Sequence, residues 1–183
     1  MYKRQIGNYI YGTSDKALWV NLFIGNTTEV TIDGKKVVMK QETDYPWDGL
    51  VKLTVTSEQP LGKELRIRIP GWCKSYTLSV NGNKVDSTTD KGYTVIKEWK
   101  TGDLIVLNMD MPVEKVSADP RVRQNTGKRA LQRGPLVYCL EETDNAKDFA
   151  DLALTPTSSF EVKDEPDNLG GIRSIKAISN GQT

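Results

Sequence analysis

The chain has 183 residues, of which 37% are hydrophobic and 27% charged, a composition typical of a globular protein and far from that of a disordered one. Its 25 basic and 24 acidic residues leave a net charge of +1, so no strong uniform field exists to bind nucleic acid or an anionic membrane. It contains no histidine, the side chain that most readily exchanges protons near neutral pH, and this favours a non-catalytic module.

Strands are predicted in the first half of the chain, where apolar residues recur at every second position. Residues 18–24 place leucine, valine and isoleucine on one face and Trp19 and Phe23 on the other. Within residues 65–69, leucine and isoleucine alternate with two arginines. Residues 105–113 extend one apolar face over a longer stretch. We therefore predict three strands with a buried face.

Dipeptides that favour tight turns separate these strands. Asp33-Gly34 and Asn81-Gly82 tolerate the positive φ that hairpins require, and Gly102-Asp103 marks a further turn. Short strands with this punctuation are typical of an antiparallel β-sandwich rather than of βαβ units. The predicted fold class is therefore all-β, with a first β-sandwich over residues 9–114.

The second half of the chain is predicted to form another β module, after a boundary near Pro112 to Pro120 that we place between residues 114 and 115. A short connecting helix is expected at Asn145–Leu154. The expected strands are 130–132, 136–140, 160–162 and 172–178. Because so few strands make a thin sandwich, we expect residues 115–183 to be a second, incomplete β-sandwich with uncovered edges or apolar faces.

Two cysteines, Cys73 and Cys139, lie in separate segments with apolar neighbours. We interpret them as buried free thiols rather than as a disulfide, because free cysteine is among the residues most often buried. Their spacing does not predict a zinc site.

No apolar run approaches the roughly 20 residues that cross a bilayer, so no membrane partner is expected. Met1–Gln5 has no signal-peptide core behind it, and the compartment stays open.

Several strings in the chain, in order, resemble glycoside hydrolase family 127. They are WVNLFIG (19–25), QETDYPWDG (41–49), RIPGWC (68–73) and above all ALQRGPLVYCLE (130–141). Each string is weak by itself, but together, at family-like spacing from about Tyr9 to Asn145, they are specific.

The resemblance implies part of a bacterial β-L-arabinofuranosidase or of a related retaining enzyme, in which an (α/α)6 barrel does the chemistry and β-sandwich domains follow it. Members of the family resemble one another in using a cysteine thiolate nucleophile, a zinc ion held by cysteines and a glutamate, and a second glutamate as acid/base. Neither Cys73 nor Cys139 matches these residues, so no catalytic, cofactor-binding or metal-binding residue is assigned in this chain. We expect residues 1–8 to be a non-family leader and the end of a lost catalytic domain. For a bacterial protein, the sequence is compatible with location in the periplasm or in the cytoplasm.

Four residues are candidates for contact with carbohydrate or with another domain: Trp47, Asp48, Trp72 and Trp99. Trp47 is able to stack on a sugar while Asp48 accepts hydrogen bonds from hydroxyls. The alternative is a rigid turn built by Pro46 and Gly49, in which the tryptophans anchor a core or an interface. We favour anchoring, and we expect Trp19 to pack against the neighbouring sheet or the missing domain.

Other charged groups do not predict a site. Glu141 and Glu142 are adjacent on a predicted strand and point to opposite faces, so they cannot form a glycosidase pair. The basic residues of 121–133 read as a solvated face or as ion pairs at a domain interface, because acidic residues follow them. Asn26-Thr27-Thr28 fits a glycosylation pattern that is common by chance.

Three functions are therefore compared. The first is a non-catalytic β-sandwich fragment whose partner is the catalytic barrel of the same polypeptide, which it supports. The alternative is a carbohydrate-binding module for arabinose-containing glycans, which requires an exposed aromatic platform. The third, a self-contained enzyme, requires a cluster of titratable groups that the sequence does not predict.

Overall fold

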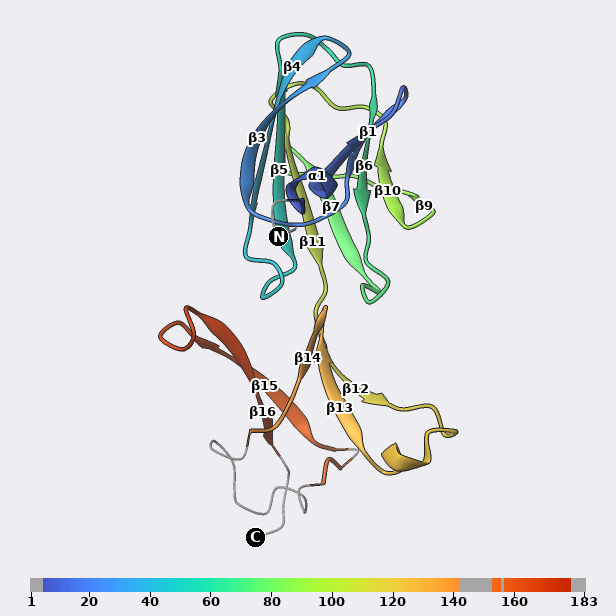
Figure 1. Cartoon of the computed structure of the whole chain (residues 1–183), viewed down its shortest axis with the longest axis vertical. Coiled ribbons are helices and arrows are strands. Elements are labelled where there is room, and N and C mark those ends of the chain that lie inside the picture. The colour runs from blue at the N-terminus through green and yellow to red at the C-terminus, as the bar shows by residue number, and fades with distance from the viewer. Residues whose placement is uncertain (1–4, 142–152, 156, 179–183) are drawn as a thin grey trace. The chain divides into compact units, whose positions relative to one another are not determined.

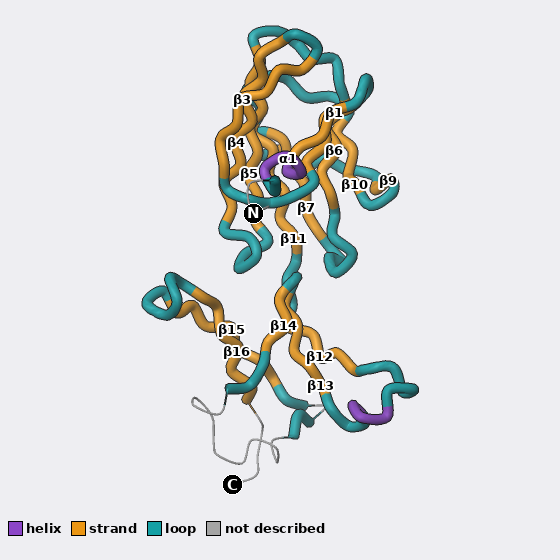
Figure 2. Tube along the Cα trace, viewed as in Figure 1, coloured by secondary structure: helices purple, strands orange, loops and turns teal. Residues whose placement is uncertain are grey.

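The computed structural model describes residues 5–141, 153–155 and 157–178. The chain divides into two compact units, Met1–Met111 and Pro112–Thr183, which are coloured from blue to yellow-green and from yellow to red in Figure 1. Strands dominate both units (Figure 2), which confirms the predicted all-β class. The helical segments of the described residues are α1 (Gly7–Ile10) and η1 (Arg123–Asn125), and neither is long and apolar enough to cross a membrane.

Unit 1 is a sandwich of two sheets. We name the five-stranded one sheet A; in spatial order it contains β1 (Tyr11–Thr13), β2 (Ala17–Val20), β6 (Glu64–Arg68), β10 (Tyr93–Ile96) and β9 (Thr89–Asp90). We name the six-stranded one sheet B; in spatial order it contains β3 (Asn26–Ile32), β4 (Lys35–Thr43), β5 (Leu50–Ser57), β11 (Leu104–Met109), β7 (Tyr76–Val80) and β8 (Asn83–Lys84).

Tight turns connect the hairpins of sheet B as predicted. Asp33 and Gly34 join β3 to β4 with φ of 51° and 74°, and Asn81 and Gly82 join β7 to β8 with φ of 50° and 80°. Two consecutive residues at positive φ match the twist of the flanking strands, which is why these dipeptides favour hairpins.

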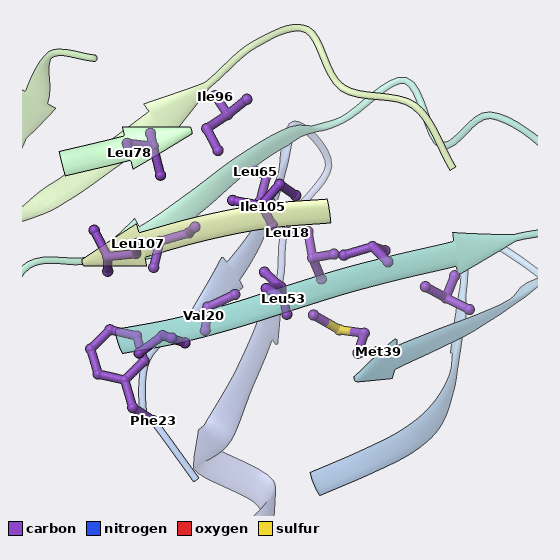
Figure 3. Close-up of a cluster of buried hydrophobic side chains, with 14 of the residues drawn as sticks. Leu18, Val20, Phe23, Met39, Leu53, Leu65, Leu78, Ile96, Ile105 and Leu107 are labelled. Carbon is purple, nitrogen blue, oxygen red and sulfur yellow. The ribbon is translucent and has the colours of Figure 1, made fainter. Parts of the chain in front are cut away.

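The core lies between the two sheets and is filled by every second residue of their strands (Figure 3). Leu18, Leu65 and Ile105 are fully buried, and Phe23 closes the cluster with 6% of its surface exposed. The backbone also packs closely at Gly49, just before β5, because its carbonyl accepts a hydrogen bond of 3.0 Å from Met109 N–H. A Cβ added to Gly49 would collide with the carbonyl group of Met109.

The pairing of β2 with β6 is parallel, unlike the other pairings described in the two sheets. It sets Leu18 beside Leu65, so that both side chains point into the core. Strand β2 ends at Val20, because Asn21 N–H donates to the Ile10 carbonyl at 2.8 Å instead of continuing the ladder.

The single strand predicted over residues 18–24 is therefore wrong beyond Val20. After the break Phe23 is buried, whereas Ile24, assigned to the inner face, is 37% exposed.

The strand predicted over residues 105–113 is also divided, because β11 ends at Met109 and a new strand begins at Val113. Asp110 N–H still donates to the Ser75 carbonyl, at 2.9 Å and in register with β7, and the pairing ends before Pro112, which has no N–H to offer a ladder. The predicted domain boundary between residues 114 and 115 falls inside the new strand.

The side chain of Lys63 connects the turn of the β1–β2 hairpin with the turn of the β3–β4 hairpin at one end of unit 1. Its ammonium group donates to the carbonyls of Ser14 (2.7 Å) and Asp15 (3.0 Å) and pairs with the Asp33 carboxylate (2.9 Å). The Lys63 side chain is only 3% exposed, whereas that of Asp33 is 63% exposed. Three acceptors thus satisfy the three donors of a buried charge.

Unit 2 contains two small sheets. Their strands are β12 (Val113–Ser117), β13 (Arg129–Arg133) and β14 (Leu136–Tyr138) in one, and β15 (Ser159–Glu165) and β16 (Ile172–Ile178) in the other. Lys115 links β12 to the second sheet, since its ammonium group donates to the Thr155 carbonyl (3.0 Å) and lies 5.6 Å from the ring centre of Phe160. The helix predicted at Asn145–Leu154 falls largely on 142–152, outside the described residues.

Candidate contact surfaces

Trp47 and Asp48 lie in the turn between β4 and β5. Trp47 N–H donates to the Asp44 carbonyl at 2.9 Å, and an Asp48 carboxylate oxygen accepts from Leu50 N–H at 2.8 Å. Part of the hydrogen-bonding capacity of Asp48 therefore shapes the turn. Both side chains are half-buried.

Trp72 lies at the same end of unit 1, stacked on the aromatic residue of that turn. The rings of Trp72 and Tyr45 are 6.4 Å apart with an interplanar angle of 23°, and Phe23 meets Tyr45 edge-on at 5.5 Å. Burial raises the pKa of Tyr45 above its usual value. Trp72 thus continues the hydrophobic core towards the surface, where it is half-buried.

Trp99 lies at the opposite end of the sandwich. Its indole N–H donates to the Lys63 carbonyl at 2.8 Å, and the neighbouring Thr101 hydroxyl bonds with the backbone of Ser57, the last residue of β5. The turn that carries Trp47 precedes the first residue of β5. The structure therefore brings Trp47, Asp48 and Trp72 to one end and places Trp99 at the other.

A second aromatic cluster, of which the sequence analysis singled out only Trp19, lies on the outer face of sheet A. Trp19 and Tyr93 meet edge-on with ring centres 4.8 Å apart, and the Arg66 guanidinium lies 5.0 Å from the Trp19 ring centre. The Trp19 indole N–H donates to the Ser14 hydroxyl, and the Tyr93 hydroxyl donates to the Asn21 side chain. The signal for this cluster in the sequence was the alternation over residues 18–24, which places Trp19 on the strand face opposite the core residues.

Arg66 is held between two carboxylates on this face. It bonds Asp90 at 2.8 Å and Glu64 at 3.0 Å, and these hydrogen bonds raise the pKa of its guanidinium. The charged group and both aromatic rings are therefore fixed in one arrangement before any partner arrives.

A shallow polar depression of about 390 Å³ lies beside β7, lined by residues 74–78 and 84–87. The Tyr76 hydroxyl there lies 3.3 Å from the Ser87 hydroxyl and 3.0 Å from that of Thr89. Burial acts to raise the pKa of Tyr76, but these hydrogen bonds outweigh it and lower the pKa.

Two family models match the chain, and their matches together cover most of it. Residues 17–111 match the model of the β-L-arabinofuranosidase middle domain of glycoside hydrolase family 127, and residues 113–178 match the family's C-terminal domain. The chain belongs to glycoside hydrolase family 127.

Curated and solved relatives of family 127 agree with this assignment. The non-reducing end β-L-arabinofuranosidase of Bifidobacterium longum is 35% identical over 181 residues, 93% of this chain and 27% of that protein. The crystal structure of a β-L-arabinofuranosidase from Geobacillus stearothermophilus T6 is 47% identical with a TM-score of 0.87, and covers 93% of this chain and 27% of its own. A further family 127 β-arabinofuranosidase structure is 34% identical with a TM-score of 0.88, and covers 94% of this chain and 30% of its own.

The chain thus spans about 27% of the length of the first two relatives. The region it matches in them is the part that the family models describe as the middle and C-terminal domains.

The resemblance implies a family zinc site held by cysteines and a glutamate. The described residues of this chain do not bring such ligands together. The Cys73 thiol donates to the Ser75 carbonyl at 3.2 Å, and Cys139 lies in the other unit. Within residues 5–141, 153–155 and 157–178, no three histidine, cysteine, aspartate or glutamate side chains come together in a metal-binding group.

Both cysteines are free thiols, but the prediction that both are buried is wrong, since Cys73 is half-buried and Cys139 is exposed. Burial raises the pKa of Cys73. Because the thiolate is the reactive form, we expect Ellman's reagent at pH 8 to modify Cys139 at least roughly 10-fold faster than Cys73. Cys139→Ser should remove the fast phase and Cys73→Ser the slow one. Equal rates in the wild type would contradict this expectation.

Among the residues that the structure describes, the charged groups set aside in the sequence do not gather into a metal-binding group. Glu141 is exposed at the end of the described segment, and Glu142 lies outside the described residues. In the basic stretch, Arg121 pairs with Asp119 at 2.8 Å, and its side chain is 91% exposed. Asn26 lies on β3, where its side-chain oxygen accepts from the hydroxyls of Tyr11 and Thr28.

Proposed function

We propose that this chain is the non-catalytic β-sandwich part of a family 127 glycosidase and that it supports the (α/α)6 catalytic barrel of the same polypeptide. The observation that carries the proposal is the match to the middle and C-terminal domain models over residues 17–111 and 113–178. The relatives are named as β-L-arabinofuranosidases, and their remaining length leaves room for the catalytic domain.

The cysteine and zinc chemistry expected from the resemblance belongs to that barrel in this proposal. The described residues of this chain take no part in that cysteine and zinc chemistry. The chain contributes by burying surface of the barrel, which raises the free energy needed to unfold the barrel.

A chimera tests the proposal. The Geobacillus relative is shortened by the part that this chain matches, and the chain is then joined in its place, which the 47% identity makes feasible. We expect the chimera to hydrolyse an aryl β-L-arabinofuranoside and the isolated chain to give no turnover. We expect activity of the shortened relative at a fixed temperature to decay at least roughly 10-fold faster than that of the chimera. Equal decay rates would refute a supporting role.

A second candidate function, carbohydrate binding, is favoured by the half-exposed Trp47 and Trp72 at one end of unit 1. In this proposal the two rings stack on an arabinofuranosyl unit and Asp48 accepts its hydroxyl hydrogen bonds. Trp99 takes no part, because it lies at the other end.

Calorimetric titration of the isolated chain with arabinofuranosyl oligosaccharides separates the two candidates. Saturable heat that Trp47→Ala abolishes and Trp99→Ala leaves intact would establish binding at this end. The supporting role alone predicts no saturable heat.

A further inference from the structure

The outer faces of the two sheets of unit 1 differ in composition. The outer face of sheet B presents two exposed apolar side chains, Val38 (36%) and Leu104 (39%), but no tryptophan or arginine, and is otherwise rich in exposed lysine, threonine and asparagine, for example at Lys36, Lys40, Lys52, Thr56, Thr77 and Asn108. That of sheet A presents Trp19, Tyr93, Arg66 and Arg68. Tryptophan, tyrosine and arginine are enriched at protein interfaces and lysine is depleted, so the face of sheet A has the composition of an interface.

The residues of this face are already ordered. Arg66 is fixed by Glu64 and Asp90 and covers Trp19, and the Tyr93 hydroxyl is tied to Asn21. Immobilising long side chains is one of the costs of association, and here little of that cost is left. The same arrangement disfavours a sugar platform, because the guanidinium lies over the indole face on which a sugar ring would stack.

The chain enters unit 1 along an edge of sheet A. Residues 5–10 lead into β1, the edge strand, through α1. Large apolar side chains are exposed around this entry: Ile6 (60%), Tyr9 (64%) and Ile24 (37%). Ile24 lies just beyond Asn21 and Leu22, whose N–H groups both donate to the Ile10 carbonyl of α1. A domain that precedes the matched middle domain in the same polypeptide would be tethered at this edge, within a few residues of the Trp19 face.

We infer that the outer face of sheet A, centred on Trp19, Arg66, Arg68 and Tyr93, is the surface on which the catalytic domain of the same polypeptide docks. This inference rests on the proposed supporting function and adds the face through which it acts. The surface of the partner is expected to present carboxylates to the exposed Arg68 and an apolar rim to Tyr9 and Ile24.

Charge reversal at matched positions of the two faces tests the inference. Arg68→Glu and Lys52→Glu make the same change of charge at exposed strand positions of sheets A and B. In the chimera with the Geobacillus relative, we expect Arg68→Glu to speed thermal inactivation roughly 10-fold and Lys52→Glu to change it by less than about 2-fold. In the isolated chain neither substitution should shift the melting temperature by more than a degree or two, which separates loss of docking from loss of folding.

A second variant, Trp19→Ala, tests the centre of the face, with circular dichroism of the isolated chain as the check on its folding. It should speed inactivation of the chimera by at least as much as Arg68→Glu does. If the unsubstituted chimera outlasts the shortened relative but Arg68→Glu and Lys52→Glu act equally, the assigned face is wrong and the supporting role stands. If the chimera does not outlast it, the supporting role fails as well. Saturable oligosaccharide binding abolished by Trp19→Ala would replace the docking role by sugar recognition.

Discussion

Gly49→Ala is expected to destabilise unit 1 by about 3 kcal/mol or more. A Cβ at this position would lie 2.9 Å from the Met109 carbonyl carbon and 3.3 Å from its Cα, and nearer still to its oxygen. Backbone atoms cannot rotate away as a side chain does. Relief requires β5 and β11 to separate, which breaks the hydrogen bond from Met109 N–H to Gly49 and disturbs the burial of Met109.

Urea denaturation monitored by tryptophan fluorescence measures this loss. Gly71→Ala is the matched control, because a Cβ at Gly71 meets nothing within 4 Å and its φ is not positive. The control should change the free energy of unfolding by less than about 0.5 kcal/mol. A similar small change for Gly49→Ala would show that the two strands accommodate the methyl group and that the close approach is not required.

Lys63→Met is expected to cost about 2–4 kcal/mol of stability, although it keeps the length and apolar stem of the side chain. The loss comes from the carbonyls of Ser14 and Asp15, which lose their ammonium donor, and from the Asp33 ion pair. Asp33 itself is well solvated, so the unpaired carboxylate adds little. The effect is instead that of leaving polar backbone groups unsatisfied where two hairpin turns meet.

Lys36→Met is the control for this substitution. Lys36 and Glu29 also form an ion pair, at 3.3 Å, but their side chains are 67% and 60% exposed. Such a pair contributes less than about 1 kcal/mol, so the control should unfold at nearly the wild-type urea concentration. Equal losses for the two variants would mean that burial of the Lys63 ammonium group has no special weight.

Local chemistry made much of the fold predictable. Alternation identified the inward residues of β6 and β11, and the Asp-Gly and Asn-Gly pairs identified two hairpins, because both signals depend on neighbours in sequence. The break after Val20 was missed, since it depends on a hydrogen bond to Ile10, which belongs to a different element. The family itself followed from strings spread over most of the chain, not from periodicity.

The contact residues were harder to predict than the fold. A tryptophan beside a turn glycine looks the same in sequence whether its indole N–H meets a carbonyl, as in Trp99, or its ring stacks on a tyrosine, as in Trp72. The cluster of Trp19, Arg66 and Tyr93 joins residues from three strands, and only the registers of β2 with β6 and of β6 with β10 bring them together. Those registers are set by the whole core.

The parallel pairing of β2 with β6 also imposes an order on synthesis. Strands β3, β4 and β5 form a meander of neighbours that is able to assemble as soon as it leaves the ribosome. The β1–β2 hairpin finds its neighbour in sheet A only after that meander has passed, when the residues around Leu65 emerge. Closing such a long loop is slow compared with forming local hairpins. A nascent chain therefore holds the Leu18 side of β2 exposed for an interval, and that is the stage at which a chaperone has most to protect.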